Sequence, residues 1–277
     1  MATITAAAVN ELRKMTGAGM MDCKKALQES NGDFETAIDY LRKKGQKISA
    51  NRADRDATEG AVIAKSNSDF TTGVIIRLSC ETDFVAKNSE FVDLANRIAD
   101  IAISNKPADV DALKALAIDD TTIGERLIEE MGKIGEKIDV SKYKIINESC
   151  VINYIHAGNR IGVLVALNMP ADNELQEAGK DVAMQIAAMN PVSVDENDIP
   201  DDVKARELEI GREQARAEGK PEQMLDKIAQ GKLQKFYKDS TLTKQAFVKD
   251  SSRTVEQMLN DVKSGLKVVS FSRIALG

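Results

Sequence analysis

The first fifty residues carry hydrophobic positions with the spacing of short helices. Four apolar residues fall at i, i+3, i+4 and i+7 and so share one face of a helix: Phe34, Ala37, Ile38 and Leu41. Asp33 is suited to cap this helix and Gly45 to end it. We expect a domain of three short helices over residues 1–50, followed by a charged linker without periodicity over 51–58.

Beyond the linker, the hydrophobic period changes from that of helices to that of strands. Every second residue is apolar over 73–80, which predicts a strand. A polar turn at 67–69 joins it to another expected strand over 61–66. The helix that follows should be capped by Ser89. It should bury one apolar face: Phe91, Leu94, Ala95, Ile98 and Ile101.

This order of strand, strand and helix occurs a second time. Expected strands over 150–155 and 161–167 flank a turn at 157–159. The helix after them carries apolar residues at helical spacing: Leu175, Ala178, Val182, Ile186 and Met189. The repeat predicts an α+β fold with a core of two similar lobes. We expect the lobes over 59–146 and over 147–190 with 237–277.

The segment over 191–236 interrupts the second lobe with a different pattern. Highly charged helices are expected on both sides of a turn at 218–221, and each has a thin apolar stripe. In the first helix Val203, Ile210 and Ala217 come seven residues apart, as in a heptad. We predict an inserted antiparallel coiled-coil hairpin. Its stripe could serve a homodimer, a wider interface with another protein, or neither.

Composition narrows the class of protein. The chain has 277 residues, 43% hydrophobic and 30% charged, which is the balance of a soluble globular protein. A net charge of −6 argues against nucleic acid as the main ligand, because phosphate binding needs a concentrated positive surface. The N-terminus lacks the pattern of a signal peptide, and no apolar run approaches the roughly 18 residues of a membrane span. We expect a cytoplasmic protein with no membrane contact.

Residue types that carry out catalysis are scarce. His156 is the single histidine, so a histidine-rich metal site is excluded. Cys23, Cys80 and Cys150 lie far apart, which argues against a zinc site or a disulfide framework. Neither standard glycine-rich phosphate loop occurs. A carboxylate pair stays open as an alternative, although charged residues usually lie on the surface. We expect a binding protein without catalytic residues, metal, cofactor or direct nucleotide binding.

Two segments are candidate interaction sites. In the first, over 16–27, Met20 and Met21 open a helix after two glycines. Methionines there either form an adaptable binding surface or fill a core that lacks aromatics. In the second, over 81–88, Asp83 and Phe84 connect a strand to its helix. Phe84 is either an exposed wedge beside an acid or the first core residue of the helix.

The same two segments resemble a known family. The sequence LRKMTGAGMMDCKKAL over 12–27 and CETDFVAK over 80–87 closely resemble the elongation factor Ts family, the guanine-nucleotide exchange factors of elongation factor Tu. Shorter matches follow in the expected order: IHAGNRIGVL over 155–164, GKP over 219–221 and LTKQAFV over 242–248. The likeness covers almost the whole chain.

The resemblance implies an architecture and a function. The family has a small N-terminal domain of ubiquitin-associated type, a core of two related α+β lobes and an inserted coiled coil. It implies that Thr82, Asp83, Phe84 and Val85 push into elongation factor Tu near its Mg²⁺ site. This protein would thereby promote GDP release and exchange for GTP during protein synthesis, without being an enzyme.

The resemblance also implies further contacts with elongation factor Tu. The N-terminal domain would dock through Arg13, Met20, Met21 and Lys24, and His156 would make a separate contact. The turn after His156 is one residue longer here than in the family's usual motif.

Overall fold

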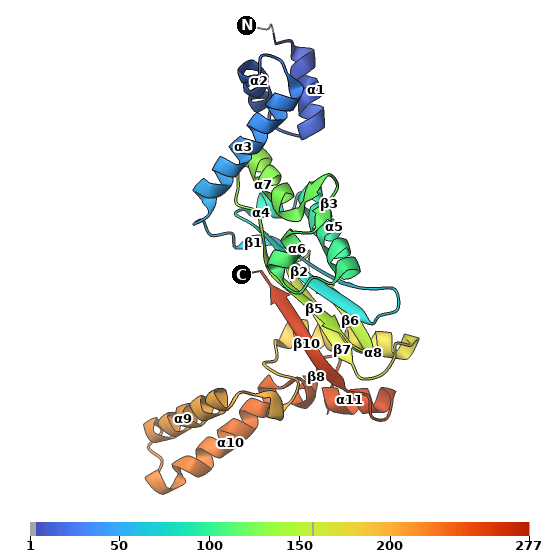
Figure 1. The fold of residues 1–277 in the computed structure, drawn as a ribbon. Coiled ribbons are helices and arrows are strands. Elements are labelled where there is room, and N and C mark those ends of the chain that lie inside the picture. Colours follow the sequence, from blue (N-terminus) through green and yellow to red (C-terminus); the bar gives the residue numbers. More distant parts are fainter. Residues whose placement is uncertain (1–3, 157, 277) are drawn as a thin grey trace. The chain divides into compact units, whose positions relative to one another are not determined.

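The structure, a computed structural model, describes residues 4–156 and 158–276 (Figure 1). These residues form a mixture of helices and small sheets, as expected for an α+β protein. They divide into two compact units. The first comprises the chain up to Ile63, Ile76–Lys144 and the end of the chain from Ala275; the second comprises Ala64–Ile75 and Ile145–Ile274.

The first unit begins with α1 (Ala6–Thr16), α2 (Met20–Glu29) and α3 (Phe34–Arg52). The expected cap of α3 is confirmed, because the Asp33 carboxylate accepts a hydrogen bond from the Thr36 amide at 2.8 Å. The helices enclose a small core of buried residues: Val9, Leu12, Ala18, Cys23, Ala26, Leu27 and Ala37. The predicted end at Gly45 is wrong, since α3 continues to Arg52.

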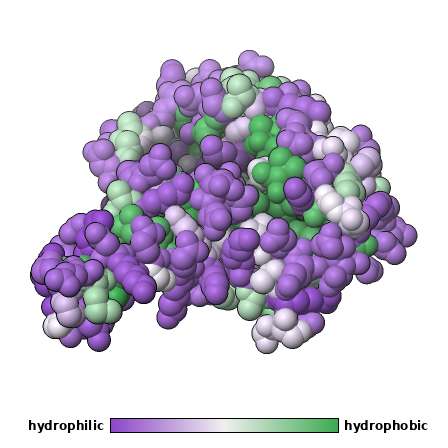
Figure 2. All heavy atoms as spheres, turned by 90° about the horizontal axis from the view of Figure 1, so that it is seen from below, coloured by the Kyte–Doolittle hydropathy of each residue, from purple (hydrophilic) through white to green (hydrophobic). Residues whose placement is uncertain are grey.

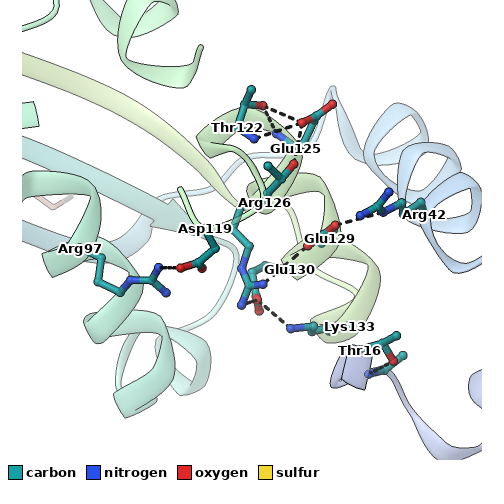
Figure 3. Close-up of polar contacts among 12 residues, drawn as sticks. Thr16, Arg42, Arg97, Asp119, Thr122, Glu125, Arg126, Glu129, Glu130 and Lys133 are labelled. Atoms are coloured by element: carbon teal, nitrogen blue, oxygen red, sulfur yellow. Dashed lines mark hydrogen bonds and ion pairs between the residues drawn. The ribbon is translucent and has the colours of Figure 1, made fainter. Parts of the chain in front are cut away.

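Gly45 instead lies where α3 packs on α7 (Ile123–Ile134). A Cβ atom at Gly45 would lie 3.0 Å from the Ile128 carbonyl oxygen. A Cβ atom at Gly132 would lie 3.1 Å from the Gly45 Cα atom. The two glycines therefore allow the two backbones to approach more closely than larger residues would. Beside this crossing, Arg42 of α3 reaches Glu129 of α7 at 3.5 Å (Figure 3).

Both predicted strand–strand–helix repeats are present. The first sheet has the order β1-β2-β5, made of β1 (Glu59–Ser66), β2 (Thr72–Cys80) and β5 (Asp139–Asn147). The long helix α5 (Ser89–Asn105) and several short elements lie between β2 and β5: α4 (Asp83–Ala86), α6 (Val110–Lys114), β3 (Ala117–Ile118) and β4 (Thr121–Thr122), followed by α7. Asn88 caps α5 in place of the expected Ser89, because its side-chain oxygen accepts from the Glu90 amide at 2.8 Å. The sequence pattern missed β5, whose exposed lysines obscure the alternation.

The second sheet has the order β10-β7-β6. β6 (Cys150–His156) and β7 (Ile161–Leu167) pair antiparallel, from Cys150 opposite Leu167 to His156 opposite Ile161. α8 (Asn173–Met189) packs on both strands. Apart from the helix pair described next, the other elements are η1 (Glu196–Asp198), η2 (Leu242–Lys244), β8 (Ala246–Phe247), β9 (Asp250–Thr254), α11 (Val255–Val262) and β10 (Val268–Ala275).

The charged segment forms two helices packed side by side, α9 (Asp201–Ala217) and α10 (Glu222–Ser240), joined by a short turn (Figure 1). The predicted stripe on α9 is wrong, because Ile210 and Ala217 are exposed. The buried residues of the pair are instead Gly211, Ala215, Leu225, Ala229 and Leu233. Gly211 allows close approach, since a Cβ atom there would lie 3.0 Å from the Ala229 Cα atom. On the α9 side, small residues therefore make the contact, and a search for large apolar side chains overlooks them.

Figure 2 shows one face on which hydrophilic residues predominate and hydrophobic ones are interspersed. None of the described helices combines the length and the hydrophobicity that crossing a membrane requires.

Candidate protein-binding surfaces

The first candidate surface lies where α1 ends and α2 begins. Met15, Met20 and Met21 have 60%, 52% and 72% of their surface exposed. Arg13 and Lys24, the two cations that the resemblance implied, are also exposed. The interpretation of Met20 and Met21 as core residues is therefore wrong. We refer to Met15, Met20 and Met21 as the methionine corner.

Buried neighbours fix the backbone of the methionine corner. Ala18 is buried between the two helices, and the buried Cys23 thiol donates to the Ala18 carbonyl at 3.6 Å. The Gly17 amide closes α1 by donating to the Arg13 carbonyl at 2.8 Å. The corner thus presents flexible apolar side chains on a fixed backbone. Met15 was not predicted as part of this surface, although it lies directly before the T-G-A-G-M-M sequence over 16–21.

The second candidate surface is α4, a helix of four residues at the end of β2. Phe84 is 83% exposed, so the interpretation that it begins the core of the next helix is wrong. Beside it, Asp83 accepts a hydrogen bond from Lys87 Nζ at 2.6 Å, which lowers the pKa of its carboxyl below the ordinary value. The helix therefore presents an exposed ring next to an ionised acid. Thr82 and Val85 are half-buried on either side.

His156 belongs to the second unit, whereas the methionine corner and α4 belong to the first. It is the last residue of β6, and its side chain is exposed. The Tyr154 hydroxyl and His156 Nδ1 lie 2.9 Å apart, within hydrogen-bond distance. A tyrosine therefore orients the imidazole. Ala157, the first residue of the expected turn, lies outside the described residues. Gly158 and Asn159 have φ values of 62° and 63°. Two such residues are typical of a type I′ hairpin turn.

Charged side chains of the first unit form ion pairs beside α7. A groove of about 660 Å³ beside α7 is lined by residues that include Arg42, Arg126, Glu129 and Lys133. Arg126 pairs with Glu130 at 3.0 Å, and Lys133 pairs with the same carboxylate at 3.0 Å (Figure 3).

The three thiols are buried. Cys23, Cys80 and Cys150 are all buried and unpaired with one another. Burial raises the pKa of all three, that of Cys80 to about 12, so the reactive thiolate is scarce near neutral pH. Within the described residues, no group of three or more potential ligands could hold a metal ion.

Comparison with known proteins gives one consistent result. The family model described as "Elongation factor TS" matches residues 81–277. The Elongation factor Ts of Cytophaga hutchinsonii is 52% identical over 277 residues, and the alignment covers 100% of both chains. That of Christiangramia forsetii is 53% identical over the same length and coverage. That of Porphyromonas gingivalis is 46% identical over 274 residues, 99% of this chain and 98% of its own.

Proposed function

The chain belongs to the elongation factor Ts family of translation factors, and on that premise we propose that it binds elongation factor Tu and promotes release of GDP, so that GTP can replace it. The observation that carries this proposal is the exposed Phe84 beside the ionised Asp83 on α4. Moving a large aromatic side chain from water into a protein pocket lowers the free energy of the system. The geometry therefore favours insertion into a partner.

The proposed action is conformational. The partner holds GDP through backbone amides, a P-loop lysine and Mg²⁺. Insertion of Phe84 would shift the elements that order the water shell of this Mg²⁺. Asp83 would disfavour return of the negatively charged phosphates, because like charges repel, and the half-buried Thr82 and Val85 would complete the inserted segment. The chain itself would bind neither the nucleotide nor the metal, and would act without covalent chemistry as a non-catalytic cytoplasmic factor.

Thermodynamic linkage sets how much binding free energy the interface with the partner must supply. If the exchange factor weakens nucleotide binding, the nucleotide weakens binding of the exchange factor by the same factor. A ten-thousand-fold effect requires about 5.5 kcal/mol of differential binding free energy. Burial of one phenylalanine contributes roughly 1.5–3 kcal/mol. Other surfaces must supply the difference.

We assign that contribution to the residues around the methionine corner and to His156. Arg13 and Lys24 flank the exposed Met20 and Met21, which gives an apolar surface with a positive rim. Such a surface suits an apolar patch on the partner that is bordered by acids. The exposed His156 would add a contact from the second unit. The helix pair α9–α10 would serve either a wider contact with the partner or the contact of a homodimer.

The test is the release of a fluorescent GDP analogue from purified elongation factor Tu. Wild-type protein should accelerate release strongly, and Phe84→Ala should slow the accelerated rate. Val192→Ala is the matched control, because it also truncates an exposed apolar side chain, 60% exposed, in the second unit. Since both side chains are exposed, neither substitution should change thermal stability appreciably.

The outcomes separate the candidate functions. Acceleration that Phe84→Ala abolishes supports the wedge mechanism. Acceleration that survives Phe84→Ala keeps nucleotide exchange but places its source elsewhere on the surface. Binding without acceleration would contradict the proposal and indicate an adaptor that holds the partner.

A further inference from the structure

The helix that carries Phe84 has no fully buried residue of its own to anchor it. α4 contains four residues, and none of them is buried. An isolated helix of this length is unstable, because nucleation costs more free energy than one turn returns. Polar contacts from outside the helix must therefore fix the direction of the Phe84 side chain.

The first such contact comes from Glu136, in the turn that follows α7. The amide of Thr82, the N-cap residue of α4, donates to Glu136 Oε2 at 3.0 Å. The Thr82 hydroxyl donates to Glu136 Oε1 at 2.7 Å. A threonine at this position usually caps its own helix, but here no side-chain cap forms. The hydroxyl of Thr82 is committed to Glu136 instead.

The second contact joins the residues next to Thr82 and Glu136, with the roles of the two segments exchanged. The Glu81 carboxylate accepts from the Lys137 amide at 2.7 Å. Glu81 thus binds the backbone of 137 while Glu136 binds the backbone of 82, and the two segments hold each other reciprocally. We call Glu81, Thr82, Glu136 and Lys137 the carboxylate clamp. Charge-assisted hydrogen bonds of this kind are stronger than neutral ones.

The carboxylate clamp also holds the end of α3. Glu81 accepts from Arg52 Nη1 at 2.6 Å and from Arg55 Nη1 at 3.2 Å, and its side chain is 15% exposed. Lys137 Nζ donates to the carbonyl oxygens of Ala53 and Arg55 at 2.6 and 2.9 Å. The segment that leaves the methionine corner through α3 is therefore tied to the base of α4.

We propose that Glu136 is a positioning residue for nucleotide exchange: through the carboxylate clamp it fixes the direction in which α4 presents Asp83 and Phe84. The inference rests on the proposed function for its effect on exchange, but not for its effect on α4 itself. A preorganised turn avoids the entropy cost of ordering on binding, so loss of the clamp reduces the efficiency of insertion.

The first measurement examines α4 in the free protein. Chymotrypsin cleaves after exposed aromatic residues when the local chain can open, so cleavage between Phe84 and Val85 reports the order of α4. Glu136→Ala should increase the rate of this cleavage about tenfold, as followed by mass spectrometry. Glu136→Gln should stay within about threefold of wild type, because its amide can accept from the Thr82 amide and donate to the Thr82 hydroxyl.

The second measurement examines exchange with elongation factor Tu. Glu136→Ala should lower the saturating rate of GDP release about tenfold, with the half-saturating concentration changed less than about threefold, and Glu136→Gln should restore most of the rate. Glu177→Ala is the matched control, since it removes the same charge from an exposed position on α8. A general loss of stability would not be expected to leave half-saturation unchanged while Gln restores the rate.

The result that would overturn the clamp is cleavage of Glu136→Ala at the wild-type rate. If wild-type protein fails to accelerate GDP release, the proposed function fails separately, and faster cleavage that Gln reverses still supports the clamp. Should Glu136→Ala not fold, Thr82→Val and Thr82→Ser replace it, because only serine keeps the hydroxyl. Equal cleavage of these two variants would overturn the proposal.

Discussion

The methionine corner and α4 both expose large apolar side chains, but the structure holds them in different ways. The corner stands on a hydrophobic core of three helices that buries residues such as Leu12, Cys23 and Leu27. α4 buries none of its own residues and is held by the carboxylate clamp. The corner offers three flexible side chains, whereas α4 offers one rigid ring. We infer that adaptable contacts suit docking, whereas a directed contact suits the displacement of elements within a partner.

The largest expected effect is that of Phe84→Ala on the maximal rate of GDP release. Loss of the ring removes roughly 1.5–3 kcal/mol of burial in the rearranged partner. We expect the saturating rate to fall about 10- to 100-fold, with the half-saturating concentration changed less than about threefold. Release of a fluorescent GDP analogue at increasing protein concentrations measures both quantities. A change confined to half-saturation would make α4 a docking surface like the corner.

The double substitution Met20→Ala and Met21→Ala should change the half-saturating concentration rather than the maximal rate. Truncation removes docking contacts that form equally before and after GDP leaves, so we expect half-saturation to rise about tenfold and the maximal rate to stay within about twofold. The same titration measures it. Met189→Ala, with 48% exposure at the end of α8, is the matched control. A fall in the maximal rate alone would remove the distinction between the two surfaces.

A smaller effect on exchange is expected from the crossing of α3 and α7, which supports the methionine corner. Gly132→Ala would place a Cβ atom 3.1 Å from the Gly45 Cα atom, so the helices must separate. We expect the free energy of unfolding to fall by about 1–3 kcal/mol and half-saturation to rise a few-fold. Urea denaturation and the same titration provide the measurements.

Gly231→Ala is the control for this glycine. It lies within α10, where an added Cβ atom would meet nothing within 4 Å. Alanine there should stabilise the helix by about 0.5–1 kcal/mol. Equal effects of the two substitutions would show that the close approach of α3 to α7 is unimportant.

The smallest expected effect is on stability: the clamp that holds α4 should make the free energy of unfolding depend on pH, whereas the methionine corner should not. Burial alone would raise the pKa of the Glu81 carboxyl, but hydrogen bonds from the Lys137 amide, Arg52 and Arg55 outweigh it and lower the pKa. A group with a lowered folded-state pKa stabilises above its unfolded pKa of about 4.3, and this contribution disappears as the pH falls through the folded-state value.

The free energy of unfolding of wild type should therefore exceed that of Glu81→Gln by about 1–2 kcal/mol at pH 7, and the difference should vanish well below pH 4. Urea denaturation at several pH values measures it. Met20→Ala with Met21→Ala should show no such pH dependence. A constant difference for Glu81→Gln would mean that its charge does not stabilise the clamp.

Much of the fold could be predicted because it depends on local patterns. The alternation before Cys80 and the helical spacing after Ser89 each reflect burial of one side of an element, so both repeats of strand, strand and helix are confirmed. The cap at Asp33 was predictable for the same reason, since it needs neighbours only three residues away. The resemblance to the elongation factor Ts family is also confirmed. The contacts of Thr82–Val85, the residues around the corner and His156 with a partner stay predictions.

The helices, the paired strands and the family could be predicted from the sequence, because hydrophobic period and long motifs are properties of adjacent residues. Which residues meet across long separations in sequence depends on how the folded elements pack. The tertiary structure turned Gly45 from a helix end into a helix crossing, and it moved the seam of α9 from Ile210 to Gly211. It also exposed Phe84 and brought Glu136 to Thr82 across 54 positions of sequence. No local pattern encodes such contacts, since their free energy depends on packing between elements that the chain brings together only when it folds.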